Sequence, residues 1–195
     1  MKEPLISVLM PVYNAEKYIA SSIKSVFNSY GKNYEFVIID DGSQDGTKDI
    51  INQFNREKLK IRYFYKSNSG IADSLNFGLS MSNGQWIARL DSDDLCQPNR
   101  FRKQLELVQK SPKIGLVGSA ALFIDSNDNN LYKYHYPESH KELVNNLLNS
   151  KAFFPHSSAF FNKQLVEYIG GYRVRLTGSE DWDLWLRISE HAEIK

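Results

Sequence analysis

Short apolar segments alternate with amphipathic segments along the first 110 residues, and this alternation restricts the fold more than any other feature. The apolar segments are predicted to be strands, and they cover residues 6–12, 35–39, 61–65 and 86–90. The amphipathic segments are predicted to be helices, and they cover residues 19–30, 47–55, 71–81 and 101–110. Helices between successive strands favour a largely parallel sheet covered on both faces. We therefore expect an α/β fold, a three-layer α/β/α sandwich with a mainly parallel central sheet.

The length of 195 residues fits one domain, because a single core grows to roughly 150 to 250 residues before a chain divides. Hydrophobic residues make up 42% of the chain, which is enough for a packed core. The Asn- and Asp-rich segment 125–130 predicts a hairpin or a surface loop. The chain ends where Ile194 and Lys195 have the character of a further strand. We expect a single domain, 1–195, that is truncated at its C-terminal end.

Charge and cysteine content exclude several classes of protein. Lys and Arg number 24 against 23 Asp and Glu, and a net charge of +1 gives no field that favours nucleic acid. Cys96 is the only cysteine, which excludes an internal disulfide or thiolate zinc cluster and fits a cytoplasmic location. The sequence has no signal-peptide pattern, and no apolar run approaches the roughly 18 to 20 residues of a transmembrane segment.

Three polar clusters directly follow predicted strands, around Asn14, at Asp40 and Asp41, and at residues 91–94. Parallel sheets bind ligands at the carboxyl ends of their strands. Because these ends share one edge of the sheet, we expect the three clusters to converge there.

Asp91, Asp93 and Asp94 place three carboxylates within four residues, with Ser92 between them. At a separation of about 4 Å and an effective dielectric near 20, each pair of unit charges repels by about 4 kcal/mol. A divalent cation would offset this repulsion, and hard oxygen ligands suit Mg²⁺ or Mn²⁺, with substrate phosphates completing the shell. The alternative is an acidic turn at a helix N-terminus, with Asp94 as the cap. The cluster alone does not decide between the two.

The remaining strand-end clusters are ambiguous when each is taken singly. Asp40 and Asp41 precede Gly42, which allows a sharp turn that exposes one or both carboxylates, but an ordinary Asp-Gly turn has the same sequence. Tyr13 offers a wall for a nucleobase, and Asn14 has a side-chain oxygen suited to capping the helix that follows.

The C-terminal part contributes a second acidic motif. Glu180 and Asp181 begin a predicted helix, whose dipole would keep a general base ionised near neutral pH; plain helix capping is the alternative. Trp182 and Trp185 are candidates to stack on a sugar ring, with a place in the core as the alternative for Trp185. The histidines show no metal-ligand spacing, and His156 is kept as the one candidate among them.

The order and spacing of these motifs together resemble glycosyltransferase family 2. The resemblance covers nearly the whole chain and rests on residues 11–14, 40–43, 68–70, 91–94, 170–172 and 180–187. It implies the GT-A fold, a nucleotide-diphosphate-sugar donor, Mn²⁺ or Mg²⁺, and an inverting displacement. It also implies a nucleotide-binding half, 1–110, and an acceptor-side half, 111–195.

The resemblance also implies a role for each motif. The nucleotide sugar would be held by Pro11, Val12, Tyr13, Asn14, Asp40, Asp41, Asn68, Gly70, Asp91 and Ser92. The metal would be bound mainly by Asp93, with Asp91 and Asp94. Catalysis would fall to Asp181 as the general base, with Glu180 beside it, and the acceptor side to Trp182 and His156.

The resemblance extends to substrates and has one departure. The donor is expected to be UDP-linked, and the acceptor a saccharide or lipid-linked molecule of cell-surface polysaccharide or lipopolysaccharide synthesis, with peripheral contact at the inner face of the cell membrane. Many relatives carry Ala-Arg-Asn where this chain has Ser74-Leu75-Asn76, so a phosphate-facing arginine is expected to be absent or replaced. Two alternatives stay open, a metal-dependent phosphohydrolase and a non-catalytic nucleotide-binding module.

Overall fold

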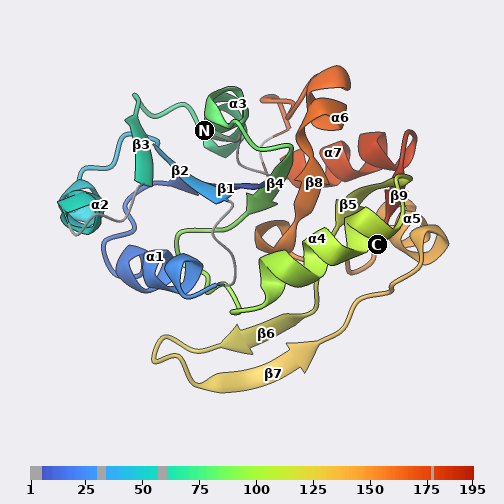
Figure 1. Ribbon diagram of the computed structural model, residues 1–195, viewed down its shortest axis with the longest axis horizontal. Coiled ribbons are helices and arrows are strands. Elements are labelled where there is room, and N and C mark those ends of the chain that lie inside the picture. The colour runs from blue at the N-terminus through green and yellow to red at the C-terminus, as the bar shows by residue number, and fades with distance from the viewer. Residues whose placement is uncertain (1–5, 30–33, 57–60, 177) are drawn as a thin grey trace.

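The computed structural model describes residues 6–29, 34–56, 61–176 and 178–195. Within these ranges the main sheet has seven strands in the order β3-β2-β1-β4-β8-β5-β9 (Figure 1). Neighbouring strands are parallel except where β8 pairs with β4 and β5. The strands are β1 (Ile6–Val12), β2 (Tyr34–Asp40), β3 (Ile61–Tyr65), β4 (Trp86–Arg89), β5 (Ile114–Val117), β8 (Phe160–Asn162) and β9 (Glu193–Ile194).

Helices cover both faces of this sheet. They are α1 (Ile19–Phe27), α2 (Thr47–Arg56), α3 (Ile71–Met81), α4 (Arg100–Lys110), α5 (His140–Leu148), α6 (Lys163–Tyr168) and α7 (Glu180–Ser189), with the 3₁₀ turn η1 (His156–Ser158). Helices α1 and α4 lie on one side of the sheet, and α3, α6 and α7 lie on the other (Figure 1). Three layers result, as the alternation of segments predicts.

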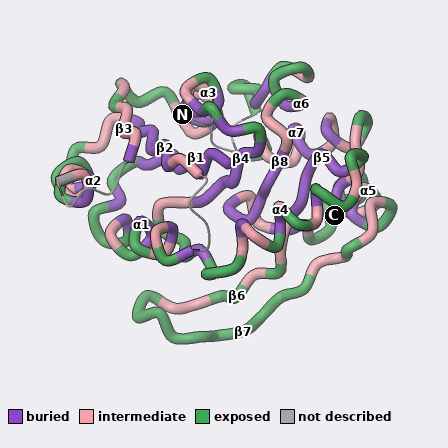
Figure 2. Tube along the Cα trace, viewed as in Figure 1, coloured by how far each residue is buried: buried purple, intermediate pink, exposed green. Residues whose placement is uncertain are grey.

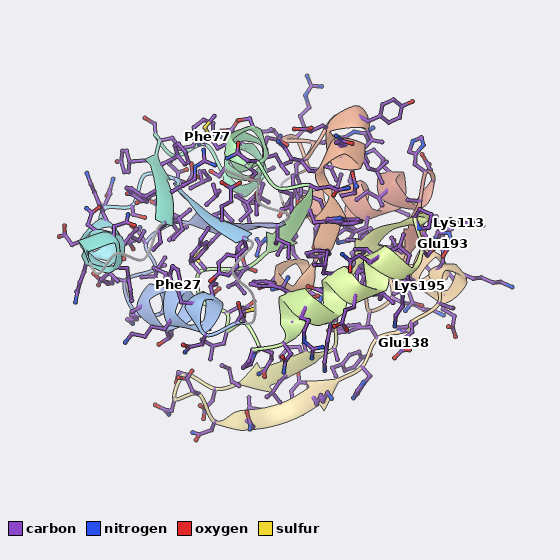
Figure 3. All side chains as sticks on the ribbon, in the orientation of Figure 1. Phe27, Phe77, Lys113, Glu138, Glu193 and Lys195 are labelled. Atoms are coloured by element: carbon purple, nitrogen blue, oxygen red, sulfur yellow. The ribbon has the colours of Figure 1, made fainter. Side chains whose placement is uncertain are left out.

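The core divides into two clusters because alternate residues of a strand point to opposite faces. In β1, Val8 and Met10 belong to the cluster under α1, α2 and α4, while Leu9 belongs to the cluster under α3, α5 and α7. Figure 3 shows the same division, with Phe27 and Phe77 on opposite sides of the sheet.

A two-stranded hairpin projects from the body below α1 and α4 (Figure 1). Its strands are β6 (Ala121–Ile124) and β7 (Asn130–Tyr134), joined by the Asn- and Asp-rich segment that predicted a hairpin. Most of its residues are exposed (Figure 2), including Leu122, Leu131 and Tyr132. Ring stacking between Phe123 and Tyr132, with centroids 4.5 Å apart, holds the two strands together.

The predicted mainly parallel sheet is confirmed, and the strand and helix at residues 61–65 and 71–81 coincide with β3 and α3. Tyr30, the end of the first predicted helix, lies outside the described residues. Every helix in the described ranges is too short or too polar to cross a lipid bilayer.

Candidate active site

The loops that follow β1, β2, β3 and β4 meet at one edge of the sheet. The parallel pairing sets this arrangement, and backbone hydrogen bonds extend it past the strand ends. Asp41 N donates to Val12 O over 2.8 Å, Lys66 N to Asp40 O over 2.9 Å, and Leu90 N to Leu9 O over 3.1 Å. The predicted convergence of the polar clusters at the carboxyl edge therefore has a structural basis.

The loop after β1 is joined to the loop after β2. Asn14 adopts φ 49°, its N–H donates to Ser43 Oγ over 3.0 Å, and its Oδ1 accepts from Gln44 N over 2.8 Å. The expectation that Asn14 caps the next helix is wrong, because α1 begins only at Ile19 and the Asn14 oxygen is used across the two loops. Tyr13 next to it is 52% exposed, whereas Pro11 and Val12 are buried.

Asp40 and Asp41 are both buried, at 0% and 5% exposure. The expectation that this turn exposes a carboxylate is therefore wrong, and the reason is the number of protein donors around each group. Asp40 Oδ1 accepts from Ser43 N over 2.8 Å and its Oδ2 from the Tyr63 hydroxyl over 2.6 Å. Asp40 thus supports the turn.

Asp41 fixes the loop at residues 68–70, which precedes α3. Its carboxylate accepts from Ser69 N over 2.9 Å, Gly70 N over 2.8 Å and Lys66 Nζ over 2.7 Å. Burial by itself would raise the pKa of Asp41, but these hydrogen bonds prevail and lower it. Asn68 and Gly70 therefore lie beside Asp41, with the Asn68 side chain exposed.

The acidic motif after β4 is attached to several distant parts of the chain. The Ser22 hydroxyl donates to Asp91 O over 3.1 Å and to Asp94 O over 2.7 Å, and Asp91 N donates to Ser157 Oγ over 3.0 Å. The Asp91 carboxylate forms an ion pair with Arg89. Ser92 is half-buried and Asp93 is exposed at the tip of the turn.

The three aspartates of this motif do not form a preformed three-carboxylate site. Within the described residues, no group of three His, Cys, Asp or Glu side chains is arranged to hold a metal ion. Asp91 is engaged by Arg89, and Asp94 makes a hydrogen bond with Ser157. Partial burial raises the pKa of Asp94, and the charges of Asp91 and Asp93 raise it further. The negative charges therefore act on one another, which a bound cation would relieve.

The second acidic motif begins α7. Glu180 is buried, and its carboxylate accepts from Gly178 N over 2.6 Å, whereas Asp181 accepts from its neighbour Trp182 N over 2.7 Å. The helix dipole was expected to favour the charged form of Asp181, but burial has the larger effect and raises its pKa, with the Glu180 charge adding to the rise. A raised pKa makes Asp181 a stronger base than an ordinary aspartate.

His156 lies next to Tyr172. The His156 Nε2 atom and the Tyr172 hydroxyl oxygen are 2.9 Å apart, and the imidazole packs edge-on against Trp185. Burial lowers the pKa of His156 well below its usual value, so the ring is neutral. The Tyr172 backbone is held by Asn76, which accepts from its N–H and donates to its carbonyl, both over 2.8 Å.

Trp182 is turned toward a neighbouring helix. Its indole N–H donates to Leu147 O over 3.0 Å, near the end of α5, and its ring packs against the core cluster on that side of the sheet. The role predicted for Trp182 in stacking on a sugar stays a prediction.

Arg89 is a site residue that sequence reasoning missed. It ends β4, is 1% exposed and pairs with Asp91. A cation inside the otherwise apolar segment 86–90 is the signal that points to it, because arginine is almost never fully buried without a specific partner.

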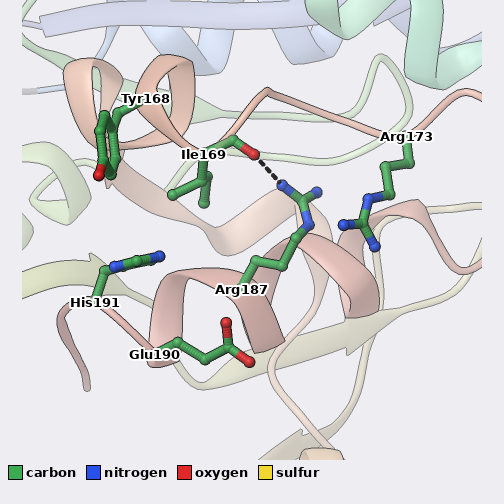
Figure 4. Close-up of a pocket in the computed structure, with 6 residues that line it drawn as sticks. All are labelled: Tyr168, Ile169, Arg173, Arg187, Glu190 and His191. Carbon is green, nitrogen blue, oxygen red and sulfur yellow. Dashed lines mark hydrogen bonds between the residues drawn. The ribbon is translucent and has the colours of Figure 1, made fainter.

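An open hollow of about 540 Å³ lies elsewhere, between α6 and α7 (Figure 4). Its lining consists of Tyr168, Ile169, Arg173, Arg187, Glu190 and His191. Arg187 is used structurally there, since it donates to Ile169 O over 2.9 Å, to Gly171 O over 2.7 Å and to the Asp183 carboxylate. None of the predicted site residues lines this hollow, so the candidate site stays at the carboxyl edge of the sheet.

Comparison with known proteins identifies the class of fold. The structure superposes on S. aureus TarS in complex with UDP with a TM-score of 0.77 at 21% identity, covering 97% of this chain and 56% of that one. It superposes on the mannosyltransferase PcManGT of Pyrobaculum calidifontis, in complex with GDP-Man and Mn²⁺, with a TM-score of 0.75 at 20% identity, covering 100% and 55%. The fold is therefore the GT-A fold of these proteins, as the resemblance implied.

Sequence comparison then gives the family. Residues 7–170 match the model of glycosyl transferase family 2, and the chain belongs to this family. The putative glycosyltransferase EpsE of Bacillus subtilis is 34% identical over 196 residues, covering 97% of this chain and 68% of its own length. An uncharacterised glycosyltransferase of Methanocaldococcus jannaschii is 30% identical, covering 96% and 65%. The chain thus spans between about half and two thirds of the length of these proteins.

Proposed function

We propose that this chain forms the catalytic domain of an enzyme that transfers a sugar from a UDP-linked donor to an acceptor hydroxyl with inversion. One observation carries the proposal. The acidic motif after β4 is joined to the η1 turn, because Asp91 N donates to Ser157 Oγ over 3.0 Å, and the neighbouring His156 Nε2 lies 2.9 Å from the Tyr172 hydroxyl. Burial raises the pKa of this hydroxyl, and the charges of Asp181, Glu180 and Asp91 all act on it and raise it further, so both acidic motifs influence one place although about ninety positions separate them in the chain.

The donor set suits a divalent cation of the Mg²⁺ or Mn²⁺ type. These ions take hard oxygen ligands and are held by one or two carboxylates together with substrate phosphates rather than by a complete protein cage. Asp93 is exposed at the strand end and would be the main ligand, with Asp91 and Asp94 in support. When bound, such an ion supplies Lewis-acid stabilisation of the negative charge that grows on the departing diphosphate.

The chain's own contribution to the reaction is base catalysis by Asp181. Its carboxylate takes the proton of the acceptor hydroxyl, whose oxygen forms a bond to the anomeric carbon. The bond from that carbon to the diphosphate oxygen breaks on the opposite face, and inversion results. Glu180 fixes the start of α7 through Gly178 N and so holds Asp181 in place.

The donor nucleotide would occupy the paired loops after β1 and β2. Tyr13 supplies an exposed aromatic wall beside the backbone of Pro11 and Val12, and Asn14 holds that loop against residues 43 and 44. Asp41 would act through the loop of Asn68 and Gly70, whose position it fixes. Asp40 supports the turn. Ser92 and Asp91 complete the donor side.

The acceptor is proposed to be a saccharide or a lipid-linked sugar on the side of His156 and Trp182. The chondroitin synthase of Pasteurella multocida is 27% identical over 193 residues, covering 98% of this chain and 20% of its own length, which supports a role in polysaccharide synthesis. We propose the cell surface as the destination of that polysaccharide. Neither a phosphohydrolase nor a non-catalytic module has support among these relatives. A cytoplasmic enzyme with peripheral contact at the inner face of the membrane is the setting that we propose.

A screen of nucleotide sugars for thermal stabilisation in the presence of Mn²⁺ tests the donor proposal, because a ligand that binds only the folded state raises Tm. Transfer or hydrolysis of the selected donor is then compared among variants. We expect Asp93→Asn to weaken Mn²⁺-dependent binding of the nucleotide, and Asp181→Asn to retain binding and lose transfer. Asp128→Asn, on the exposed hairpin loop, is the matched control and should change neither. Normal transfer by Asp181→Asn would overturn the assignment of the base.

A further inference from the structure

Arg89 occupies an unusual position for a charged residue. It is the last residue of β4 and is 1% exposed. Alternation along the strand places it on the same face as Ile87, which belongs to the core cluster under α3 and α7. The guanidinium therefore lies inside the protein on the side where α7 begins.

Two other arginines show what a structural arginine looks like in this protein. Arg100 donates to Arg89 O over 2.7 Å, to Ala159 O over 3.1 Å and to Gln104 Oε1 over 3.1 Å. Arg187 donates to two backbone carbonyls and to the Asp183 carboxylate. Both tie segments of backbone together.

Arg89 has no such set of bonds. Its Nη1 atom forms an ion pair with Asp91 Oδ1, but neither Nη1 nor Nε makes a well-aligned hydrogen bond. A buried cation with unsatisfied donors is costly, and each such group in a native structure calls for an explanation, such as a catalytic role or an ion bound nearby. The cost indicates that Arg89 serves the site rather than the fold.

Asp91, the partner of Arg89, is fixed by the ion pair but stays accessible to solvent. The ion pair uses Oδ1 of Asp91, whose side chain remains 33% exposed. The buried Arg89 guanidinium therefore fixes Asp91, while the Asp91 carboxylate stays partly exposed at the edge of the sheet. The charge of Arg89 also acts on Asp181, His156 and Tyr172, which places all four residues around the same spot.

We propose that Arg89 is a positioning residue that holds the Asp91 carboxylate in the orientation required to bind the metal and nucleotide. This inference rests on the proposed function, since it deals with how the donor is held. Arg89 acts through Asp91 and does not touch the donor.

The experiment is calorimetry with UDP and with GDP, each with and without Mn²⁺, on the whole chain. Arg89→Met removes the charge and keeps the length of the side chain, and Arg89→Lys keeps the charge. Removing a group that orients a metal ligand typically costs about 10- to 100-fold in metal affinity, so we expect a loss of this size in Mn²⁺-dependent nucleotide affinity for Arg89→Met. Arg89→Lys should recover part of it.

A double-mutant cycle separates positioning from general destabilisation. If Arg89 acts through Asp91, the double variant Arg89→Met/Asp91→Asn should bind no more weakly than Asp91→Asn alone. Arg62→Met is the matched control, because it breaks an arginine–glutamate pair with Glu35 at the opposite edge of the same sheet. It should lower Tm and leave nucleotide affinity unchanged.

Three results would overturn the inference. The first is that Arg89→Met binds the nucleotide with Mn²⁺ as tightly as the unaltered chain. The second is that the affinity losses of Arg89→Met and Asp91→Asn add in full in the double variant. The third is that Arg89→Met lowers Tm without changing affinity, as Arg62→Met is expected to do. The failure of the proposed function looks different, because the unaltered chain would then bind neither nucleotide with Mn²⁺, and the inference about Arg89 would fall with it.

Discussion

Asp91 N donates a hydrogen bond to Ser157 Oγ over 3.0 Å, although 66 positions separate the two residues in the chain. Asp91 belongs to the acidic motif after β4, and Ser157 to the η1 turn next to His156. Ser157 is 6% exposed and also makes a hydrogen bond with the Asp94 carboxylate. One hydroxyl group thus joins the proposed donor side of the site to the proposed acceptor side.

Ser157→Ala removes this link. The Asp91 N–H would lose its acceptor inside the protein, and an unsatisfied donor of this kind costs about 1–3 kcal/mol in unfolding free energy. We also expect weaker Mn²⁺-dependent nucleotide binding, because the turn that carries Asp93 is less restrained. Denaturant unfolding and calorimetry measure the two effects. Ser80→Ala is the control, since Ser80 is exposed on α3 and bonds only within its helix; equal results for both serines would contradict the prediction.

The pH dependence of transfer should report on Asp181. Burial raises the pKa of this carboxyl above the ordinary value of 3.8, and Glu180 adds to the rise, while Trp182 N and Arg89 oppose it. A general base works only in its ionised form, so the rate should fall as the pH drops through the raised pKa, at a higher pH than for an ordinary aspartate. Initial rates of donor turnover across the acid range measure this. A rate that stays constant below pH 3.8 would contradict the prediction.

Asp41 should stabilise the protein at neutral pH and lose this effect in acid. Its hydrogen bonds lower its pKa below the ordinary 3.8, so its stabilising contribution is present above that value and is lost as the pH falls through the lower, folded-state pKa. Asp41→Asn should therefore lower the unfolding free energy by about 1–3 kcal/mol at neutral pH, because Lys66 and the backbone N–H groups lose a charged acceptor. The difference in unfolding free energy between Asp41→Asn and the unaltered chain should narrow below pH 3.8. Urea unfolding at several pH values tests this, and a difference that widens in acid would contradict it.

Apolar and helical patterns were sufficient to predict the fold of the described residues between 6 and 110, where segments that follow one another in the chain also pack on one another. The apolar run 61–65 and the helical repeat 71–81 carry their structure in their own sequence, and β3 and α3 match them. The sequence did not reveal β8 or α6. β8 has only three residues, and its place depends on pairing with Trp86 to Ala88, far away in the chain. Strands this short are fixed by tertiary contacts rather than by intrinsic preference.

The site shows the same limit. The convergence of the strand-end clusters followed from a parallel sheet, which could be predicted. The burial of Asp40 and Asp41 could not, because it depends on Tyr63 and Lys66, which their own sequence context does not reveal. Arg89 was not predicted as a site residue, because its importance depends on its burial and on its ion pair with Asp91, which only the folded structure shows.

Gly42 tests how closely the loops at the sheet edge must approach. Its φ of 86° is strained for any residue with a side chain, and an added Cβ would lie 2.9 Å from Asn68 N, in the backbone of the loop that Asp41 fixes. Gly170 is the matched control, because its φ of 89° is similar and an added Cβ would meet nothing within 4 Å. Backbone strain alone costs about 1–3 kcal/mol, and we expect Gly170→Ala to show that loss in unfolding free energy.

Gly42→Ala should lose more than Gly170→Ala, because the contact with Asn68 N adds to the same strain and moves the loop. It should also weaken nucleotide binding, whereas Gly170→Ala should leave binding unchanged. Denaturant unfolding compares the stabilities, and calorimetry with UDP and Mn²⁺ compares the affinities. Equal losses of stability together with unchanged binding would mean that the close approach of the two loops is not needed, and the proposed donor site would then have to be placed elsewhere along the edge of the sheet.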